Sequence, residues 1–452
     1  MNASPPRRTD PFVLLAGVLL FGYLLMSRTF AHWGIGPLYV GEMALAAYLV
    51  ARPASLAEPW LRSLAVPTRL STFSWWLTIS LAYGAFECVR GLIMGSPLLV
   101  GEIAVIHLYP LYVLPGLWVG RRHPNVLSRL IPILAWCHGV YGLAFITVFA
   151  PLGLSQSLED PSVVGWLGHP AGSSILLLGL LAFQRNLWRG SIPMLLNILV
   201  MIGMQRRAEW VAFIAAVMLW AYLAGRVKQL VYFAGLLVCV LLLGLLPDFE
   251  FPSPGFRGES MSTYDLVSRL LAPIDPDAAA DLSPDADAYA ATATWRSDYW
   301  GAVWNEVHAT EERAVFGLGY HYPLWQLHPF HNMEENPART PHSIFVFVLG
   351  YSGWLGVLIF VGLQGALARL LWRTYRETGE PFGICLWTLA MVWAIFDPLL
   401  ERPVGAIPLY LLMGMAAAQT ITRDAFLHSR TASRIGHPRG STNGAEPGTG
   451  SP

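Results

Sequence analysis

The chain has 452 residues, of which 54% are hydrophobic and only 13% are charged, and its formal net charge is zero. A water-soluble protein of this length could hardly bury so much apolar surface, so the composition places the chain in the membrane class. The four cysteines all lie in apolar runs and far apart in the sequence, which predicts neither a disulfide framework nor a zinc knuckle.

Apolar runs of about 20 residues recur along the chain, and each is long enough to cross a hydrocarbon core of roughly 30 Å as a helix. Helix is the only option for these runs, because hydrocarbon offers no partner to backbone N–H and C=O groups. We therefore predict an all-α polytopic membrane protein with about 12 transmembrane helices. The predicted spans are 11–30, 34–51, 71–91, 100–119, 130–150, 171–184, 190–204, 208–225, 229–247, 342–364, 382–399 and 404–421.

The long interval between the ninth and tenth spans predicts one large loop, and a terminal stretch rich in Ser, Thr, Gly and Pro predicts a disordered tail. No small-residue cleavage site follows the first apolar run, so the first helix is expected to be retained. The predicted divisions are 1–10 (cytoplasmic N-terminus), 11–247 (helices 1–9), 248–341 (large loop), 342–421 (helices 10–12) and 422–452 (cytoplasmic tail).

The distribution of Lys and Arg predicts the orientation in the membrane, because positive residues are retained on the cytoplasmic side. Nineteen of the 29 basic residues fall in every second connection and in both tails. Both termini are therefore expected in the cytoplasm and the large loop on the opposite side. The arginines that do not follow this rule are Arg28, Arg90, Arg206, Arg207, Arg257, Arg269, Arg296, Arg313, Arg339 and Arg402.

Arg206 and Arg207 are adjacent at the start of the span 208–225. Both the side of the membrane and the positive end of the helix dipole disfavour cations at this position. Paired guanidinium groups can clamp a phosphate or pyrophosphate bidentately, which is the functional interpretation. The alternative is a pair of ordinary contacts with carboxylates or lipid phosphates on the same side.

The large loop carries fifteen Asp and Glu against five Arg. Its segment 272–294 is acidic and Ala-rich and is expected to be solvated and poorly ordered. Segment 295–315 has helical periodicity, with aromatic residues along one stripe, and predicts a helix at the outer membrane interface. The stripe consists of Trp295, Tyr299, Val303, Trp304 and Val307.

Single polar residues at the predicted spans offer further candidates. His342 directly follows the loop, where a neutral imidazole with a pKa of about 6.5 could serve as a general base or simply cap the helix. Glu42 lies near mid-span without a partner in sequence and is expected to face substrate. Glu87 and Arg90 can pair at i, i+3. Asp397, Glu401 and Arg402 are also polar groups in or beside spans.

Two groups of residues in the loop resemble metal ligands only weakly. The histidines lack a firm ligand spacing, and the aspartate pairs lie in the acidic stretch, where a solvated tract is expected instead of a cation site. We therefore predict no metal. The groups are His321, His328 and His331 with Glu334 and Glu335, and Asp275–Asp277 and Asp285–Asp287.

With these features the chain resembles the O-antigen ligase and O-antigen polymerase superfamily of bacterial cell envelopes. Three motifs carry the resemblance, in the family's order and spacing. They are Arg207-Ala208-Glu209-Trp210 at the start of a middle span, Arg296 with Trp300 and Gly317-Leu318-Gly319 in the loop, and His342 with Gly353 at the next span.

The resemblance implies a GT-C-like enzyme of the bacterial inner membrane that needs neither metal nor cofactor. It would move a glycan from undecaprenyl pyrophosphate to an acceptor hydroxyl on the periplasmic side, with inversion. Its partners would be that lipid-linked glycan, a glycan or lipid acceptor, the bilayer, and proteins of polysaccharide assembly or export. The implied roles are catalysis for His342, Arg207 and Arg296, substrate binding for Arg206, Glu209, Trp300 and Glu42, and structure for Gly317, Gly319 and Gly353.

Two other classes of function stay open at this point. A transporter or flippase of lipid-linked glycans would place charges along a path reached from both leaflets. A non-catalytic component of an envelope polysaccharide assembly complex would need no active site at all. The sequence leaves the sugar, the linkage, the acceptor and the oligomeric state undefined.

Overall fold

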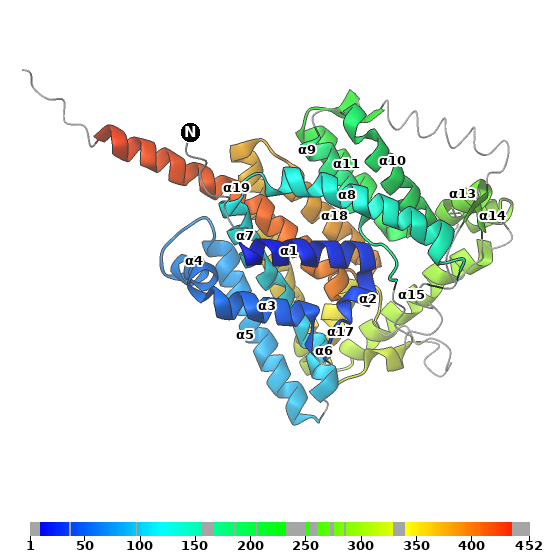
Figure 1. Cartoon of the computed structure of the whole chain (residues 1–452). Coiled ribbons are helices and arrows are strands. Elements are labelled where there is room, and N and C mark those ends of the chain that lie inside the picture. Colours follow the sequence, from blue (N-terminus) through cyan, green and yellow to red (C-terminus); the bar gives the residue numbers. More distant parts are fainter. Residues whose placement is uncertain are drawn as a thin grey trace, which may run out of the picture.

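The structure is a computed structural model in which helices from distant parts of the sequence form one bundle (Figure 1). It describes residues 10–435 except 36–37, 96, 153, 155–166, 185–186, 205, 229, 232–249, 253–259, 272–274, 284–285 and 329–339.

The first half of the bundle consists of helices that precede the large loop. They are α1 (Pro11–Phe21), η1 (Gly22–Met26), α2 (Ser27–Ala31), α3 (Val40–Ala51), α4 (Pro53–Ala65), α5 (Ser71–Ile93), α6 (Pro97–Leu108), η2 (Tyr109–Tyr112), α7 (Val113–Arg122), α8 (Val126–Ala144), η3 (Phe145–Phe149), α9 (Ser173–Phe183), α10 (Leu187–Gly203) and α11 (Arg207–Leu223).

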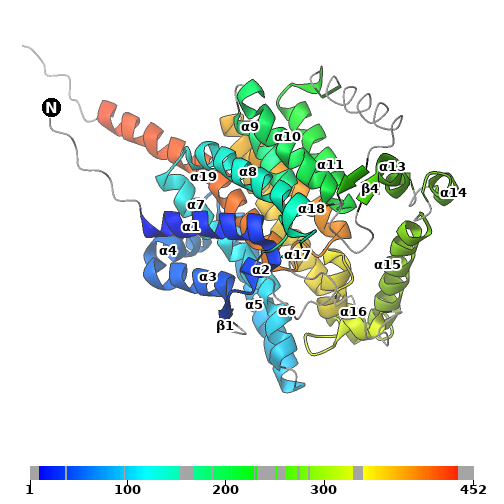
Figure 2. The ribbon, with the colours of Figure 1, turned by 45° about the vertical axis from the view of Figure 1, so that its right-hand side comes forward.

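The second half comprises the helices of the loop, which lie on one flank of the bundle in Figure 2, and those that follow it. They are α13 (Thr263–Leu271), α14 (Pro276–Ala280), α15 (Ala286–Val307), α16 (Glu311–Phe316), η4 (Leu324–Leu327), α17 (Ile344–Thr378), α18 (Phe382–Phe396) and α19 (Pro403–Ile435). Two short antiparallel hairpins pair β1 (Gly34–Ile35) with β2 (Leu38–Tyr39) and β3 (Glu250–Pro252) with β4 (Ser260–Ser262).

The predicted all-α membrane architecture is confirmed. Within the described residues, four helical segments are long and apolar enough to cross a membrane: Pro11–Ala31, Pro97–Arg122, Val126–Phe149 and Ile344–Thr378. Five further apolar helices are shorter. The number of about 12 spans stays a prediction, since most of the ninth predicted span lies outside the described residues.

Two segments of the chain differ from their predicted structure. The acidic stretch 272–294 contains α14 and the first turns of α15, because alanine favours helix and Asp275 caps α14 by accepting a hydrogen bond from Ala278 N at 3.0 Å. Helix α19 continues to Ile435, where a disordered tail from residue 422 was expected.

Most of the stripe of α15 packs into the protein core. Tyr299, Val303 and Val307 are fully buried in the main core, whereas Trp304 on another face is 49% exposed. The helix therefore packs most of its stripe against the protein, and its place at the membrane interface stays a prediction.

Helices α7 and α19 lie side by side and pack backbone to backbone (Figure 1). A methyl group added at Gly116 would lie 2.2 Å from the Leu411 carbonyl oxygen, and one added at Gly414 would lie 2.3 Å from that of Val113. Small residues at a helix crossing permit such close approach in membrane proteins.

Candidate functional site

His342 lies in a short connection that leads into α17, and its backbone is strained. Its φ of +54° falls in the left-handed region, which a residue with a side chain seldom adopts and which is often found at functional sites. The Trp300 indole donates a hydrogen bond to the Pro341 carbonyl oxygen at 2.6 Å, and so holds the peptide just before His342.

Helix α15 places an aromatic and a cationic side chain, Trp295 and Arg296, beside His342. The Trp295 ring stands edge-on to the imidazole with centroids 5.5 Å apart, and the Arg296 guanidinium lies 5.5 Å from the Trp295 ring centroid. The charge of Arg296 acts directly on His342. The structure thus brings together three residues predicted from the sequence, namely Arg296, Trp300 and His342.

Asp397 and Arg402 approach the same histidine from the connection between α18 and α19. Asp397 ends α18 in an extended conformation and accepts a hydrogen bond from Trp393 Nε1 at 3.0 Å. The charges of Asp397 and Arg402 both act on His342. The sequence marked these two residues only as polar groups beside spans, without assigning them a role.

The electrostatics of this centre keep the histidine neutral. Burial lowers the pKa of His342 to about 4; the carboxylate of Asp397 opposes this shift, while the positive charges of Arg296 and Arg402 add to it. A neutral imidazole has a free ring nitrogen and can accept a proton at neutral pH.

Glu209 connects α11 to α9 and extends the polar region. It is only 2% exposed, and its Oε1 accepts hydrogen bonds from Ser174 N at 3.0 Å and from Ser174 Oγ at 2.9 Å. The charges of Arg206 and Asp397 both act on Glu209. Asp397 therefore lies within electrostatic reach of both Glu209 and His342.

Arg206 is one source of the positive charge that acts on the buried groups of this region. Helix α11 begins at Arg207, and Arg206 precedes it in an extended conformation. Burial and the charges of Arg206 and Arg28 hold the pKa of His169 well below its usual value. The catalytic role that the resemblance implies for Arg207, the first residue of α11, stays a prediction.

Glu401 is a buried carboxyl group in the same connection as Asp397. It is 7% exposed, and neither carboxylate oxygen has a hydrogen-bond partner among the residues that the structure describes. Burial raises the pKa of Glu401 to about 8, while the positive charge of Arg402 partly opposes the shift. At neutral pH this group is therefore protonated.

Glu42 belongs to a different cluster. It lies in the first turn of α3, and its charge acts on Tyr23, Tyr109 and Tyr112. The charges that act on His342 do not include that of Glu42. The substrate-facing role of Glu42 stays a sequence-based prediction.

The predicted structural glycines meet where the loop touches α17. Gly353 interrupts that helix with a φ of +59°, and Gly317 has a φ of +70°. A methyl group at Gly317 would lie 2.4 Å from Ser352 N, and one at Gly353 would lie 2.4 Å from the Val315 carbonyl oxygen. Gly319 also has a positive φ of 83°.

The weak metal-ligand candidates are not assembled in the described part of the chain. Its residues contain no group of three or more His, Cys, Asp or Glu that could hold a metal ion. His328 packs instead against Trp295 and Tyr299, with ring centroids 5.1 Å and 5.0 Å away. His331, Glu334, Glu335 and Asp285 lie outside the described residues.

Arginines from separate elements supply positive charge to linked polar groups: Arg296 and Arg402 act on His342, Arg206 acts on Glu209 and His169, and Arg28 acts on His169. Such a centre can hold an anion such as a phosphate by guanidinium hydrogen bonds, and a neutral imidazole beside it can take up a proton. The arginines are Arg28 on α2, Arg206 before α11, Arg296 on α15 and Arg402 before α19.

Comparison with known protein families gives one match. Residues 192–361 match the family model described as O-antigen ligase, and this segment contains Arg206, Glu209, Arg296, Trp300 and His342. The match confirms the resemblance to the O-antigen ligase and polymerase superfamily. A search of curated proteins finds no match to the chain.

Proposed function

We propose that this chain, which carries an O-antigen ligase domain, is a membrane glycosyltransferase that moves a glycan from undecaprenyl pyrophosphate to an acceptor hydroxyl on the periplasmic side. It would act as a polymerase or ligase of O-antigen or exopolysaccharide, with inversion and without a metal. The observation that carries the proposal is the placement of Arg296 and Trp300 on α15 beside the strained His342, with the charges of Asp397 and Arg402 acting on the same histidine.

The arginines supply what the leaving group needs. When the bond between the anomeric carbon and the pyrophosphate oxygen breaks, negative charge grows on the phosphate oxygens. Guanidinium groups that are already in place stabilise this charge without reorganising, and such preorganised electrostatics often make the largest contribution to catalysis. Arg207, Arg296 and Arg206 are the residues assigned to this role, and Arg402 adds positive charge beside His342.

His342 supplies the second half of the reaction. The acceptor oxygen forms a bond to the anomeric carbon on the face opposite the pyrophosphate, and its proton passes to the neutral imidazole. The carboxylate of Asp397 then stabilises the imidazolium, because its charge favours the protonated form. The strained backbone of His342 and the Trp300 bond to Pro341 would fix the direction of the ring.

In-vitro transfer with a defined undecaprenyl-pyrophosphate-linked glycan tests this function. The chain in detergent or liposomes should transfer the glycan with and without a chelator, and His342→Gln and Arg296→Lys should abolish or strongly reduce transfer. Arg313→Lys is the matched control, since Arg313 forms a surface ion pair with Glu306 in the same loop. Movement of the lipid-linked glycan across liposomes without transfer would overturn the proposal in favour of a flippase.

Surface glycan in a deletion strain separates the sub-classes. Single-unit glycans indicate the loss of a polymerase, and polymer that accumulates on the carrier lipid indicates the loss of a ligase. Normal surface glycan in a His342→Ala strain with a normal protein level would refute catalysis and support a non-catalytic component of an assembly complex.

A further inference from the structure

Arg90 on α5 is held inside the bundle by a buried acidic partner. Its Nη1 lies 3.3 Å from Glu87 Oε1, and Glu87 is fully buried. The Tyr83 hydroxyl lies 3.0 Å from the same carboxylate oxygen and 2.9 Å from the Ser352 carbonyl oxygen on α17. The predicted i, i+3 pair therefore exists, and it belongs to a network that reaches another helix.

The guanidinium of Arg90 also bonds to the loop. Its Nη1 donates to the Phe316 carbonyl oxygen at 2.9 Å and its Nη2 to the Gly317 carbonyl oxygen at 3.2 Å. A planar guanidinium can reach two adjacent carbonyls and a carboxylate at once, whereas the single ammonium of a lysine cannot span them. The segment Phe316–Tyr320, which we call the strap, is thus bonded to α5 along its carbonyl side.

The amide side of the strap bonds to α17. Leu318 N donates to the Gly350 carbonyl oxygen at 2.8 Å and Gly319 N to the Tyr351 carbonyl oxygen at 3.0 Å. These carbonyls precede the helix break at Gly353. The break displaces the backbone N–H groups four residues further on, which would bond these carbonyls in a regular helix. The break in α17 therefore creates the acceptors that the strap uses.

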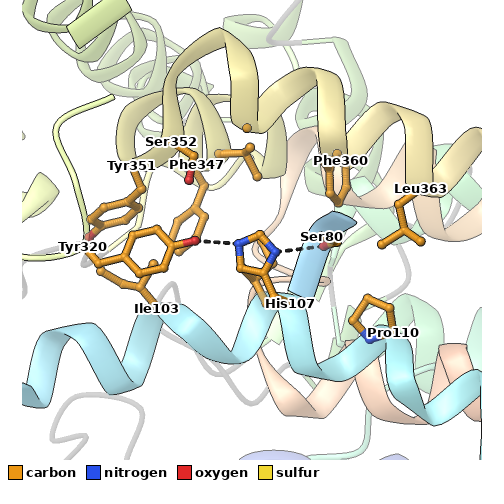
Figure 3. Close-up of a pocket in the computed structure, with 13 residues that line it drawn as sticks. Ser80, Ile103, His107, Pro110, Tyr320, Phe347, Tyr351, Ser352, Phe360 and Leu363 are labelled. Carbon is orange, nitrogen blue, oxygen red and sulfur yellow. Dashed lines mark hydrogen bonds between the residues drawn. The ribbon is translucent and has the colours of Figure 1, made fainter. Parts of the chain in front are cut away.

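The far end of the strap is fixed by a third helix. The Tyr320 hydroxyl lies 2.5 Å from His107 Nε2 on α6, and His107 Nδ1 lies 2.9 Å from Ser80 Oγ on α5 (Figure 3). Tyr320 and His107 line an apolar cavity with Phe347 and Tyr351 of α17. Helices α5, α6 and α17 thus hold the strap from three directions.

The strap continues directly from α16 and α15, and α15 carries Arg296. Helix α17 follows His342 after one intervening residue. We propose that Arg90 is a positioning residue for the transfer reaction, which fixes the strap on the break of α17 so that Arg296 on α15 and His342 keep their relative placement. The inference rests on the proposed function of the His342 centre and adds a residue that does not touch it.

Kinetics of Arg90→Lys and Arg90→Ala test the proposal. Lysine keeps a positive charge beside Glu87 but cannot bond both carbonyls, so both variants should lose about 10- to 100-fold in kcat, from one or two charge-assisted hydrogen bonds. The KM for the lipid-linked donor should change little, and Lys should not rescue. Arg313→Lys should keep wild-type kcat. Full kcat in Arg90→Lys would overturn the proposal.

A distance measurement gives a readout that needs no activity. Spin labels at Ser297 on α15 and Leu358 on α17 report the distance between the two helices, and both positions are exposed. The labels are introduced in a chain whose native cysteines are replaced by serine. We expect a narrow distance distribution for the parent and Arg313→Lys, and a broad one for Arg90→Lys. If Arg90→Ala does not fold, Arg90→Lys and Glu87→Gln carry the test.

The two proposals fail in different ways. If the parent chain transfers no glycan but the distance distribution broadens in Arg90→Lys, the glycosyltransferase function is overturned. The conclusion that Arg90 fixes the placement of α15 relative to α17 is still supported. A parent chain that transfers glycan, with an equally narrow distribution and equal kcat in Arg90→Lys, would overturn the role of Arg90 alone.

Discussion

Replacing Trp300 by phenylalanine isolates the hydrogen bond that holds the peptide before His342. The ring of phenylalanine keeps most of the packing of α15, but the variant has no N–H to donate to the Pro341 carbonyl oxygen, now bonded at 2.6 Å. Pro341 is buried, so this oxygen would lose its donor without free access to water. His342, one residue further, would lose a support of its left-handed backbone.

The expected size of the effect follows from the lost bond. An unsatisfied buried acceptor costs about 1–3 kcal/mol. At about 1.4 kcal/mol for each factor of ten, kcat should fall roughly 5- to 140-fold if the bond is needed to orient the imidazole in the transition state. The KM for the lipid-linked donor should stay close to that of the wild type, because the arginines that bind phosphate are untouched.

The assay is single-turnover transfer of a defined lipid-linked glycan, combined with thermal unfolding of the same preparations. Trp304→Phe is the matched control, since Trp304 lies one turn further along α15 and is 49% exposed. Wild-type kcat in Trp300→Phe, with a melting temperature lowered as much as the bond predicts, would refute the link between this bond and His342.

Three further results are expected. Gly353→Ala should destabilise the protein by more than about 2 kcal/mol in thermal unfolding, because φ is +59° and the methyl group would meet the Val315 carbonyl at 2.4 Å, whereas Gly365→Ala, with open space around it, should be neutral or stabilising. With the pKa of His342 lowered to about 4, the transfer rate should fall only as the pH drops towards that value, and an inflection at the usual 6.5 would contradict a buried neutral base. The pKa of Glu401 is about 8 in the folded protein and 4.5 in the unfolded chain, so the folded state binds the proton more tightly and the protein loses stability as the pH rises from 4.5 to about 8. Glutamine cannot ionise, so Glu401→Gln should melt at a higher temperature than the wild type at about pH 9 but not at about pH 5.

Features set by local sequence could be predicted well. Hydropathy and charge counts depend on one segment at a time, and they indicated the helical class and the position of His342 beside a span. Hydropathy and helical periodicity also predicted a helix starting near Arg207 and the helix that carries Arg296 and Trp300. The family motifs then predicted that Arg296 and His342, which are far apart in the sequence, belong to one site.

Features set by packing between distant helices could not be predicted. Asp397 and Arg402 are separated from Arg206 by nearly two hundred residues, and whether they face the same centre depends on how each helix is rotated. His169 lies in a connection with no motif around it, so nothing in the sequence marked it.

The backbone contact between α7 and α19 limits how these two helices can move relative to each other. Because Gly116 and Gly414 leave no side chain between the two helices, sliding either along the other would drive backbone atoms into each other. The two helices therefore form one rigid unit. Arg402 directly precedes α19 and is attached to the end of this unit. Arg296, which also acts on His342, lies instead on α15 at the flank of the bundle, so separate parts of the fold carry these two positive charges (Figure 2).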